Sequence, residues 1–432
     1  MLLSVAYCYR VRFPEGAAPH WDAAPLEAND PNSLGNIFPS DKFIFWRLAM
    51  KCIRILVLIL SACFVSVAWG QQQQACTAYT PWQEFHRYNM ERWNPCEHVL
   101  NVNNVGDLQV KWSYPIGRTD GSPVVANGLV YIRTDDGLLY ALKASNGHLR
   151  WKYQTAKGVC CTGPAPAIAN GVVYIGSLDG LLYALNASTG AKLWTYQTGA
   201  DVESSPSVAN GVVYFGSDDG NVYALKASTG ALLWSYTTGD SVDSSPAVAN
   251  GVVYVGSQNG KVYSLDAGTG ALLWSYATGG SVVSSPAVAN GAVYVGSQDS
   301  NLYALNASTG ALLWSYGIGG GQYNYSSPAV ANGVVYIGSG LGANTIYAWQ
   351  ASTGALVWSL NTGNNIGGSP AVANGIVYVG NYSWYMYALN ASTGAVLWNY
   401  HTGGAVSSSP VVANGVVYVG STDGYLYAFG LK

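Results

Sequence analysis

One segment, typified by SSPAVANGVVYVGS, recurs eight times along this chain and sets the spacing of everything after residue 105. Each copy carries one proline, and successive prolines lie 40 to 43 residues apart. A period near forty residues, made of short apolar runs between turn residues, is typical of a β-propeller with four strands in each blade. The sequence therefore predicts an all-β, eight-bladed propeller whose repeats are anchored at Pro123, Pro166, Pro206, Pro246, Pro286, Pro328, Pro370 and Pro410.

The repeat at residues 284–319 shows how one blade is built. SSPAVA is the expected first strand, and Asn290-Gly291 is a turn pair whose residues tolerate positive φ. VYVGS, LYALNA and LLWSY follow as the second, third and fourth strands. Because Val, Tyr, Leu and Trp favour a pleated surface, we expect these strands to be largely buried. No run has helical spacing.

The two ends of the repeat region are each incomplete. Trp112 lies in DLQVKWSYPIG, a fourth strand without the three that should precede it, and the chain ends at YLYAFGLK, a third strand without a fourth. We therefore expect the N-terminal strand to pair with the C-terminal blade. This pairing closes the ring and leaves no exposed sheet edge between its ends.

Charge is scarce, which excludes several classes of function. Charged residues make up 9% of the chain and the formal net charge is -3, so no basic field is present to bind nucleic acid. From Ala267 to Thr422 the sole carboxylate is Asp299, and there is no Lys or Arg. Acid-base or metal chemistry spread around the whole ring is therefore excluded, and we expect a monomer with no metal site.

The N-terminal region predicts export. Residues 50–70 have the basic start, apolar run and small-residue end of a signal peptide, with cleavage before Gln71. Residues 1–49 lack repeat character and are expected to be a disordered, non-native upstream extension, whereas 71–104 form a lead segment before the propeller at 105–432. The expected location is periplasmic or extracellular. Lipidation of Cys63 as an outer-membrane lipoprotein, or an uncleaved membrane anchor, remains an alternative.

Four cysteines remain after such cleavage: Cys76, Cys96, Cys160 and Cys161. An oxidising compartment favours disulfides, and four cysteines permit three pairings. We favour a bond between Cys76 and Cys96, which would staple the lead segment.

Two segments point to a known family. ALNASTGALLW at Ala304–Trp314 resembles the tryptophan-docking motif of PQQ-repeat quinoprotein propellers, and Trp82–Trp112 resembles the segment that precedes their first blade. The resemblance implies the fold of quinoprotein alcohol dehydrogenases and of the propeller lipoprotein of outer-membrane protein assembly. It is less specific for activity, because such repeats also occur in non-catalytic exported proteins.

A sharper resemblance concerns cofactor binding. Cys160 and Cys161 stand where PQQ-dependent alcohol dehydrogenases carry a vicinal disulfide against the quinone, which implies PQQ with calcium as cofactors. Those enzymes place an Arg five residues after the second cysteine, where this chain has Pro166, and no catalytic Asp matches a family motif. Alternatively, both thiols fill apolar space, or one pairs with an upstream cysteine. We therefore favour a non-catalytic binding or scaffolding module, with a PQQ-dependent oxidoreductase as the alternative.

Loops on one face of the propeller carry the candidate ligand-binding residues. The connections from fourth to first strand and from second to third strand open on the same face. Asp120, Glu203 and Asp243 share one repeat position there, and Arg118 and Asp201 share another. Converging carboxylates could hold a cation or a basic ligand. The simpler interpretation, which we favour, is that these are solvated loop charges too far apart to interact.

Aromatic residues gather on the same loops: Tyr323, Tyr325, Tyr382, Trp384 and Tyr385. Exposed aromatic side chains with little charge around them suit a protein, a peptide or a carbohydrate. Packing between blades is an equal alternative.

Overall fold

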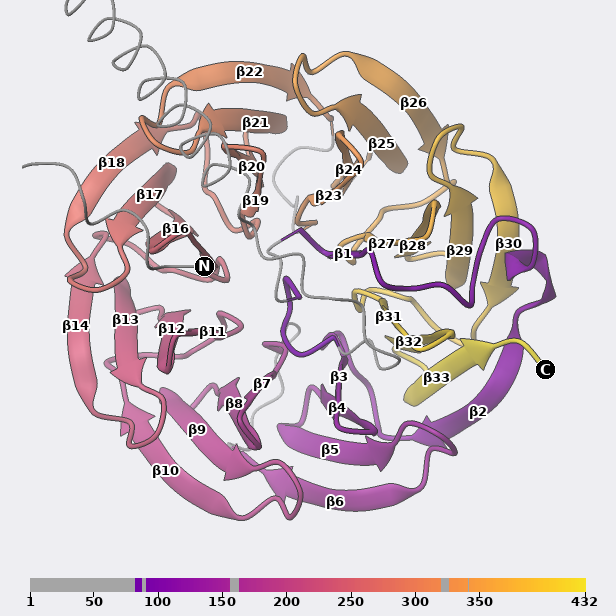
Figure 1. Cartoon of the computed structure of the whole chain (residues 1–432), viewed down its shortest axis with the longest axis horizontal. Coiled ribbons are helices and arrows are strands. Elements are labelled where there is room, and N and C mark those ends of the chain that lie inside the picture. Colours follow the sequence, from indigo (N-terminus) through magenta and orange to yellow (C-terminus); the bar gives the residue numbers. More distant parts are fainter. Residues whose placement is uncertain (1–81, 88–90, 156–162, 320–325, 341) are drawn as a thin grey trace, which may run out of the picture. The chain divides into compact units, whose positions relative to one another are not determined.

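The computed structural model describes residues 82–87, 91–155, 163–319, 326–340 and 342–432, all within the compact unit Ala75–Lys432. Eight antiparallel sheets of four repeat strands surround a central channel in this unit, as Figure 1 shows. In seven blades the strands follow chain order from the channel outward, whereas in the closing blade β2 takes the outermost place. The predicted eight-bladed propeller is confirmed. Among the described residues, no helix has the length and apolar character to cross a membrane.

The first and second strands of each blade lie nearest the channel. The first strands are β3 (Val124–Ala126), β7 (Ala167–Ala169), β11 (Ser207–Ala209), β15 (Ala247–Ala249), β19 (Ala287–Ala289), β23 (Ala329–Ala331), β27 (Ala371–Ala373) and β31 (Val411–Ala413). The second strands are β4 (Leu129–Arg133), β8 (Val172–Gly176), β12 (Val212–Gly216), β16 (Val252–Ser257), β20 (Ala292–Gly296), β24 (Val334–Gly338), β28 (Ile376–Gly380) and β32 (Val416–Gly420).

The third and fourth strands form the outer part of each blade. The third strands are β5 (Leu138–Lys143), β9 (Leu181–Asn186), β13 (Asn221–Lys226), β17 (Lys261–Asp266), β21 (Asn301–Asn306), β25 (Thr345–Gln350), β29 (Tyr385–Asn390) and β33 (Tyr425–Gly430). The fourth strands are β6 (Leu149–Gln154), β10 (Lys192–Gln197), β14 (Leu232–Thr237), β18 (Leu272–Ala277), β22 (Leu312–Gly317), β26 (Leu356–Asn361), β30 (Val396–His401) and β2 (Gln109–Pro115).

A tryptophan on each fourth strand joins its blade to the next. The indole of Trp234 donates to the carbonyl of Ala267 at 3.0 Å and packs on Gly270, where a Cβ atom would lie 2.7 Å from the ring. Gly270 also has a φ of +73°, a conformation that favours glycine. Repeating this contact fills the space between blades with buried aromatic surface.

Ring closure uses the same contact. β2 pairs antiparallel with β33, and the indole of Trp398 in blade seven donates to the carbonyl of Leu108, just before β2, at 3.0 Å. The predicted pairing of the N-terminal strand with the C-terminal blade is confirmed.

The serines before each first strand link neighbouring blades. Each first strand is shorter than predicted, because it begins after the proline, which has no N–H to donate. The N–H of Ser245 instead donates to the hydroxyl of Ser285 in the next blade at 2.9 Å. Among the described residues seven such bonds surround the channel, one of them donated by Ala165, with acceptors Ser122, Ser205, Ser245, Ser285, Ser327, Ser369 and Ser409.

The described residues of the lead segment from Trp82 to Asn94 lie in the channel. These residues bond to first strands in six blades, and His86 contacts the carbonyl of Ser245 just before the first strand of another. For example, Trp82 pairs with Val125, and the side chain of Asn94 donates to Val412. β1 (Trp93–Asn94) adds a parallel strand beside β27, and the short 3₁₀ turn η1 (Val105–Asp107) leads into β2. The first-strand edges are thereby capped within the channel.

The connections divide between two faces of the disc. Ala267 in a third-to-fourth turn bonds to Gly251 in a first-to-second turn, so these turns share one side, here called the turn face. Asp218 in a second-to-third turn bonds to Asp201 in a fourth-to-first connection. These connections share the opposite side, the loop face, as predicted.

Candidate functional site

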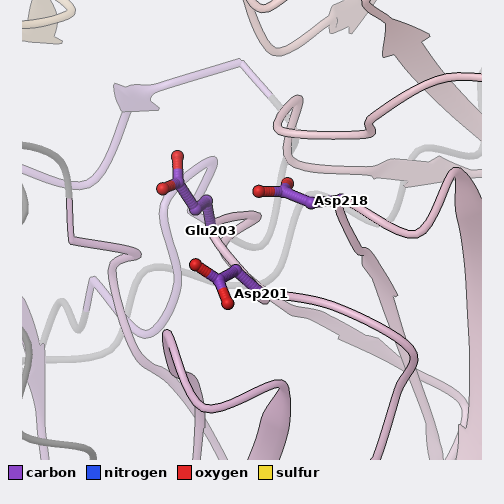
Figure 2. Close-up of side chains that lie close together, drawn as sticks. All are labelled: Asp201, Glu203 and Asp218. Carbon is purple, nitrogen blue, oxygen red and sulfur yellow. The ribbon is translucent and has the colours of Figure 1, made fainter.

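Three carboxylates meet on the loop face. Asp201 and Glu203 lie in the connection that enters β11, and Asp218 lies in the turn after β12. Carboxylate oxygens of the three residues lie within 4.8 Å of one another (Figure 2). The backbone bond from Asp218 N to Asp201 O, 2.9 Å long, holds the two loops together. The expectation that Asp201 and Glu203 are too far apart to interact is therefore wrong.

Asp243, in the connection before β15, brings a fourth carboxylate to this group. Its Oδ2 accepts a 2.7 Å hydrogen bond from the Gln258 amide. One oxygen of Asp243 and one of Asp218 are buried, and a side-chain hydrogen bond between these two residues places Asp243 beside the other three. We call Asp201, Glu203, Asp218 and Asp243 the acidic cluster.

The acidic cluster perturbs its own ionisation. Burial raises the pKa of Asp218 to about 7, and the negative charges of Asp243 and Glu203 add to this effect. Like charges held close together disfavour full ionisation, and a bound cation relieves that repulsion. Clustered carboxylate oxygens are the donors that hard cations such as Ca²⁺ prefer.

Asp120 belongs to a different group of residues. Its carboxylate accepts a short hydrogen bond from Ser407 and lies 3.9 Å from the guanidinium of Arg118. Arg118 also pairs with Asp135 at 3.1 Å. The repeat position shared by Asp120, Glu203 and Asp243 therefore serves two separate groups.

Arg133 is a buried cation on the same side of the ring. It ends β4, where the corresponding second strands end their apolar run in glycine, as at Gly216. Its side chain is 1% exposed, and its three guanidinium nitrogens have no hydrogen-bond partner. Burial lowers the pKa of Arg133, while the charges of Asp135 and Glu203 raise it. An unpaired buried guanidinium is energetically costly.

Two of the predicted aromatic residues are exposed. Tyr382 is 46% and Trp384 47% exposed, which favours accessible side chains over packing between blades. Tyr385 is half-buried, with its ring 4.8 Å from that of His401. Tyr323 and Tyr325 lie outside the described residues.

Of the four cysteines predicted to form disulfides or bind a cofactor, the structure describes only Cys96. Cys96 is buried and disulfide-bonded, but Cys76 lies outside the described residues, so their pairing stays a prediction. Cys160 and Cys161 also lie outside the described residues.

Two functional candidates were missed from the sequence. The charged residues that indicate this site in the sequence lie in the loop before the proline, whereas Asp218 lies in the turn after the second strand. Arg133 had a clear signal, since it replaces the glycine that ends this strand in Val212–Gly216 and its equivalents. At Gly216 a Cβ would lie 2.2 Å from the Val242 carbonyl oxygen, so a side chain at this repeat position needs a locally different structure.

Two family profiles match the propeller. The family described as beta-alanine-activating enzyme, beta-propeller matches residues 120–339, just over half of the chain. The family of outer membrane protein assembly factor BamB matches residues 342–432.

Curated relatives match only short stretches. The dehydrogenase subunit of alcohol dehydrogenase (quinone) from Gluconobacter oxydans is 33% identical over 76 residues, 17% of this chain and 10% of that protein. Quinohemoprotein alcohol dehydrogenase ADH-IIG from Pseudomonas putida is 35% identical over 69 residues, 15% of this chain and 10% of that protein. The chain thus spans about a tenth of the length of these relatives.

Solved structures share the fold. Quinohemoprotein alcohol dehydrogenase from Comamonas testosteroni has a TM-score of 0.73 at 18% identity, covering 83% of this chain and 81% of its own. BamB from Moraxella catarrhalis has a TM-score of 0.63 at 21% identity, covering 75% and 98%. With eight blades joined by docked tryptophans and a propeller profile over half its length, this chain belongs to the family of the beta-alanine-activating enzyme β-propeller, within the PQQ-repeat propellers.

Proposed function

We propose that this protein is an exported, non-catalytic binding module that holds a cation, or the basic group of a ligand, at the acidic cluster. The observation that carries the proposal is the meeting of Asp201, Glu203 and Asp218 within 4.8 Å on adjacent loops. Loops on a rigid ring are where a propeller positions ligand-binding side chains.

A hard divalent cation fits the acidic cluster best. The cluster offers carboxylate oxygens with partly buried surroundings, and Ca²⁺ binds such oxygens in flexible geometry. Asp218 has a pKa of about 7, so a proton and a metal ion compete for the same group near neutral pH. Calcium binding should therefore strengthen as pH rises from 6 to 8.

The exposed aromatic residues extend the binding role to a larger partner. Tyr382 and Trp384 present half-exposed rings on the loop face. Their apolar faces and polar atoms suit a carbohydrate, a peptide or a protein surface. In this proposal the loop face carries a cation in one sector and a partner in another.

A PQQ-dependent oxidoreductase is the second candidate, and one structural observation favours it. The three unpartnered nitrogens of Arg133 fit a carboxylate, which the quinone carries, and the acidic cluster fits its calcium ion. When bound, the quinone would accept two electrons from an alcohol. Arg133 would neutralise a carboxylate of the quinone, and the acidic cluster would hold calcium.

Calcium titration tests the first proposal directly. Titration calorimetry and thermal unfolding of the wild-type protein should show saturable calcium binding, which Glu203→Gln combined with Asp218→Asn should abolish. The matched control is Asp240→Asn, which removes an exposed carboxylate elsewhere on the loop face. Equal binding by the double variant and the control would overturn the proposal.

Adding PQQ separates the two candidates. Bound quinone absorbance together with alcohol-dependent dye reduction would establish the oxidoreductase. Calcium binding without quinone binding supports the module. Export is tested separately, by determining the N-terminus of the protein recovered outside the cytoplasm, which is expected at Gln71.

A further inference from the structure

A β-bulge at the start of the fourth strands exposes leucines in pairs. In blade four, Ser264 pairs with Trp274 while Leu265 pairs with Leu272, so Leu273 is an extra residue. Regular alternation would turn one of two adjacent leucines inward, and a bulge interrupts that alternation. Leu272 is 46% and Leu273 52% exposed. The prediction that the fourth strand is largely buried is wrong at this point.

Exposed leucine pairs occupy the same two positions of the fourth strand in the neighbouring blades three and five. Each pair adjoins the third-to-fourth turn and so lies at the rim of the turn face. We call these six exposed residues the leucine rim: Leu232, Leu233, Leu272, Leu273, Leu312 and Leu313. Repeated exposed apolar side chains on one side of a protein indicate an interaction surface.

Cations accompany the leucine rim on the same side. Lys143 and Lys226 end the third strands of blades one and three, while Arg150 and Lys192 lie at the start of fourth strands. Lys111 holds the corresponding place in β2. All five are exposed. Among the described residues, this side also carries three acids, the buried Glu97 together with Asp107 and Asp266.

The loop face has the opposite character. Carboxylates outnumber cations there: the acidic cluster is joined by Asp135, Asp219, Asp240 and Asp299, against the exposed cations Arg118 and Lys261. The disc is therefore polarised along its axis, with carboxylates on one face and cations with leucines at the rim of the other. A flat partner of negative charge can contact several blades of the turn face at once, and the same partner repels the loop face.

We propose that the turn face docks on an anionic lipid bilayer, with the leucine rim entering the interface and the five cations contacting lipid headgroups. Interfacial binding combines buried apolar area with attraction of Lys and Arg to anionic lipid. A second copy docked through the same face would bring these cations together, which opposes that alternative. Docking leaves the acidic cluster facing away from the membrane.

Vesicle co-sedimentation of the protein as purified from its host tests this surface. Binding is expected to vesicles containing phosphatidylglycerol, to weaken with salt, and to be far weaker with phosphatidylcholine alone. Replacing three cations as Lys143→Gln, Arg150→Gln and Lys192→Gln should lower the partition coefficient by roughly a hundredfold. Lys261→Gln, which removes an exposed cation at the loop-face end of β17, should leave binding unchanged.

A second variant tests the apolar part. Leu233→Gln, Leu273→Gln and Leu313→Gln together change only exposed side chains and should lower the partition coefficient at least tenfold, with unfolding by urea unaltered. Equal binding by wild type and both triple variants would overturn the proposal. So would sedimentation showing a dimer, or a complex with an acidic protein, that requires the leucine rim while vesicles remain unbound.

Discussion

The side-chain amide of Gln258 donates a 2.7 Å hydrogen bond to Oδ2 of Asp243, and this neutral contact leaves the charge of the carboxylate uncompensated. Its Oδ1 is buried, as is Oδ1 of Asp218, and protonated Asp218 shares a side-chain hydrogen bond with Asp243. The acidic cluster is thus held by backbone and amide contacts that fix its geometry. Like-charged groups fixed in this way store repulsion that a proton or a cation can relieve.

Replacing Asp218 should therefore change how stability depends on pH. Its pKa rises from 3.8 to about 7 on folding, so the folded protein binds a proton between these values that the unfolded chain releases, and stability falls as pH rises through this window. Asp218→Asn should stabilise the protein at pH 8 by about 1 to 2 kcal/mol, allowing for solvent screening, with little effect at pH 4. Urea unfolding at both pH values measures this, and a pH-independent effect would contradict it.

Glu84 offers an independent pH-dependent site inside the channel. Burial raises its pKa from 4.5 to about 8, against the hydrogen bond from Val208 N. Stability should therefore fall as pH rises from 4.5 to 8. Glu84→Gln retains an acceptor for Val208 and should gain about 3 kcal/mol at pH 9 but almost nothing at pH 4.

The control for this experiment is Glu84→Ala, measured by the same urea titrations. It removes the acceptor and leaves the Val208 N–H buried, which should cost about 1 to 3 kcal/mol at pH 4. Parallel pH profiles for wild type and Glu84→Gln would show that Glu84 does not carry the effect.

The repeat predicts the ring because each blade packs against its neighbour through the same residues. Its period, its turn glycines and its tryptophans all act locally or between adjacent blades, so the blade count and the closure through Trp112 follow from the sequence. The acidic cluster cannot be predicted from the repeat alone, because Asp218 and Asp243 come from different kinds of loop in different blades. Their meeting depends on the 3.2 Å hydrogen bond from Val242 N to Ser217 O, which joins the two loops.

The position of the lead segment also could not be predicted from the sequence. Its sequence has no repeat character, and nothing in it indicates that Trp82 pairs with Val125 in the first blade. It packs in the channel because the first strands of a ring leave inward-facing edges that need partners. Similarly, the exposed pair Leu272 and Leu273 depends on a bulge, which hydrophobic alternation alone does not reveal.

Tryptophan docking predicts a large effect for a small substitution. Gly270→Ala places a methyl group where Cβ lies 2.7 Å from the Trp234 ring, at a φ of +73°. Gly251→Ala is the matched control, because Gly251 has a φ of +77° and no atom within 4 Å of its Cβ position. Both variants carry the backbone strain of about 1 kcal/mol, and Gly270→Ala should lose roughly 1 to 3 kcal/mol more. Equal urea midpoints would contradict the docking contact.

Trp384 combines backbone strain with exposure, and two substitutions separate these properties. Its φ is +72°, in a turn where the equivalent residue in blade four is Gly260, and its ring lies 5.6 Å from His401. Trp384→Gly and Trp384→Ala lose the same ring contact, but only glycine relieves the strain, so Trp384→Gly should be about 1 kcal/mol more stable in urea unfolding. Both variants should lose binding of a carbohydrate or peptide partner equally, if the indole contacts it. Weaker binding by only one variant would instead assign the effect to the backbone of the turn.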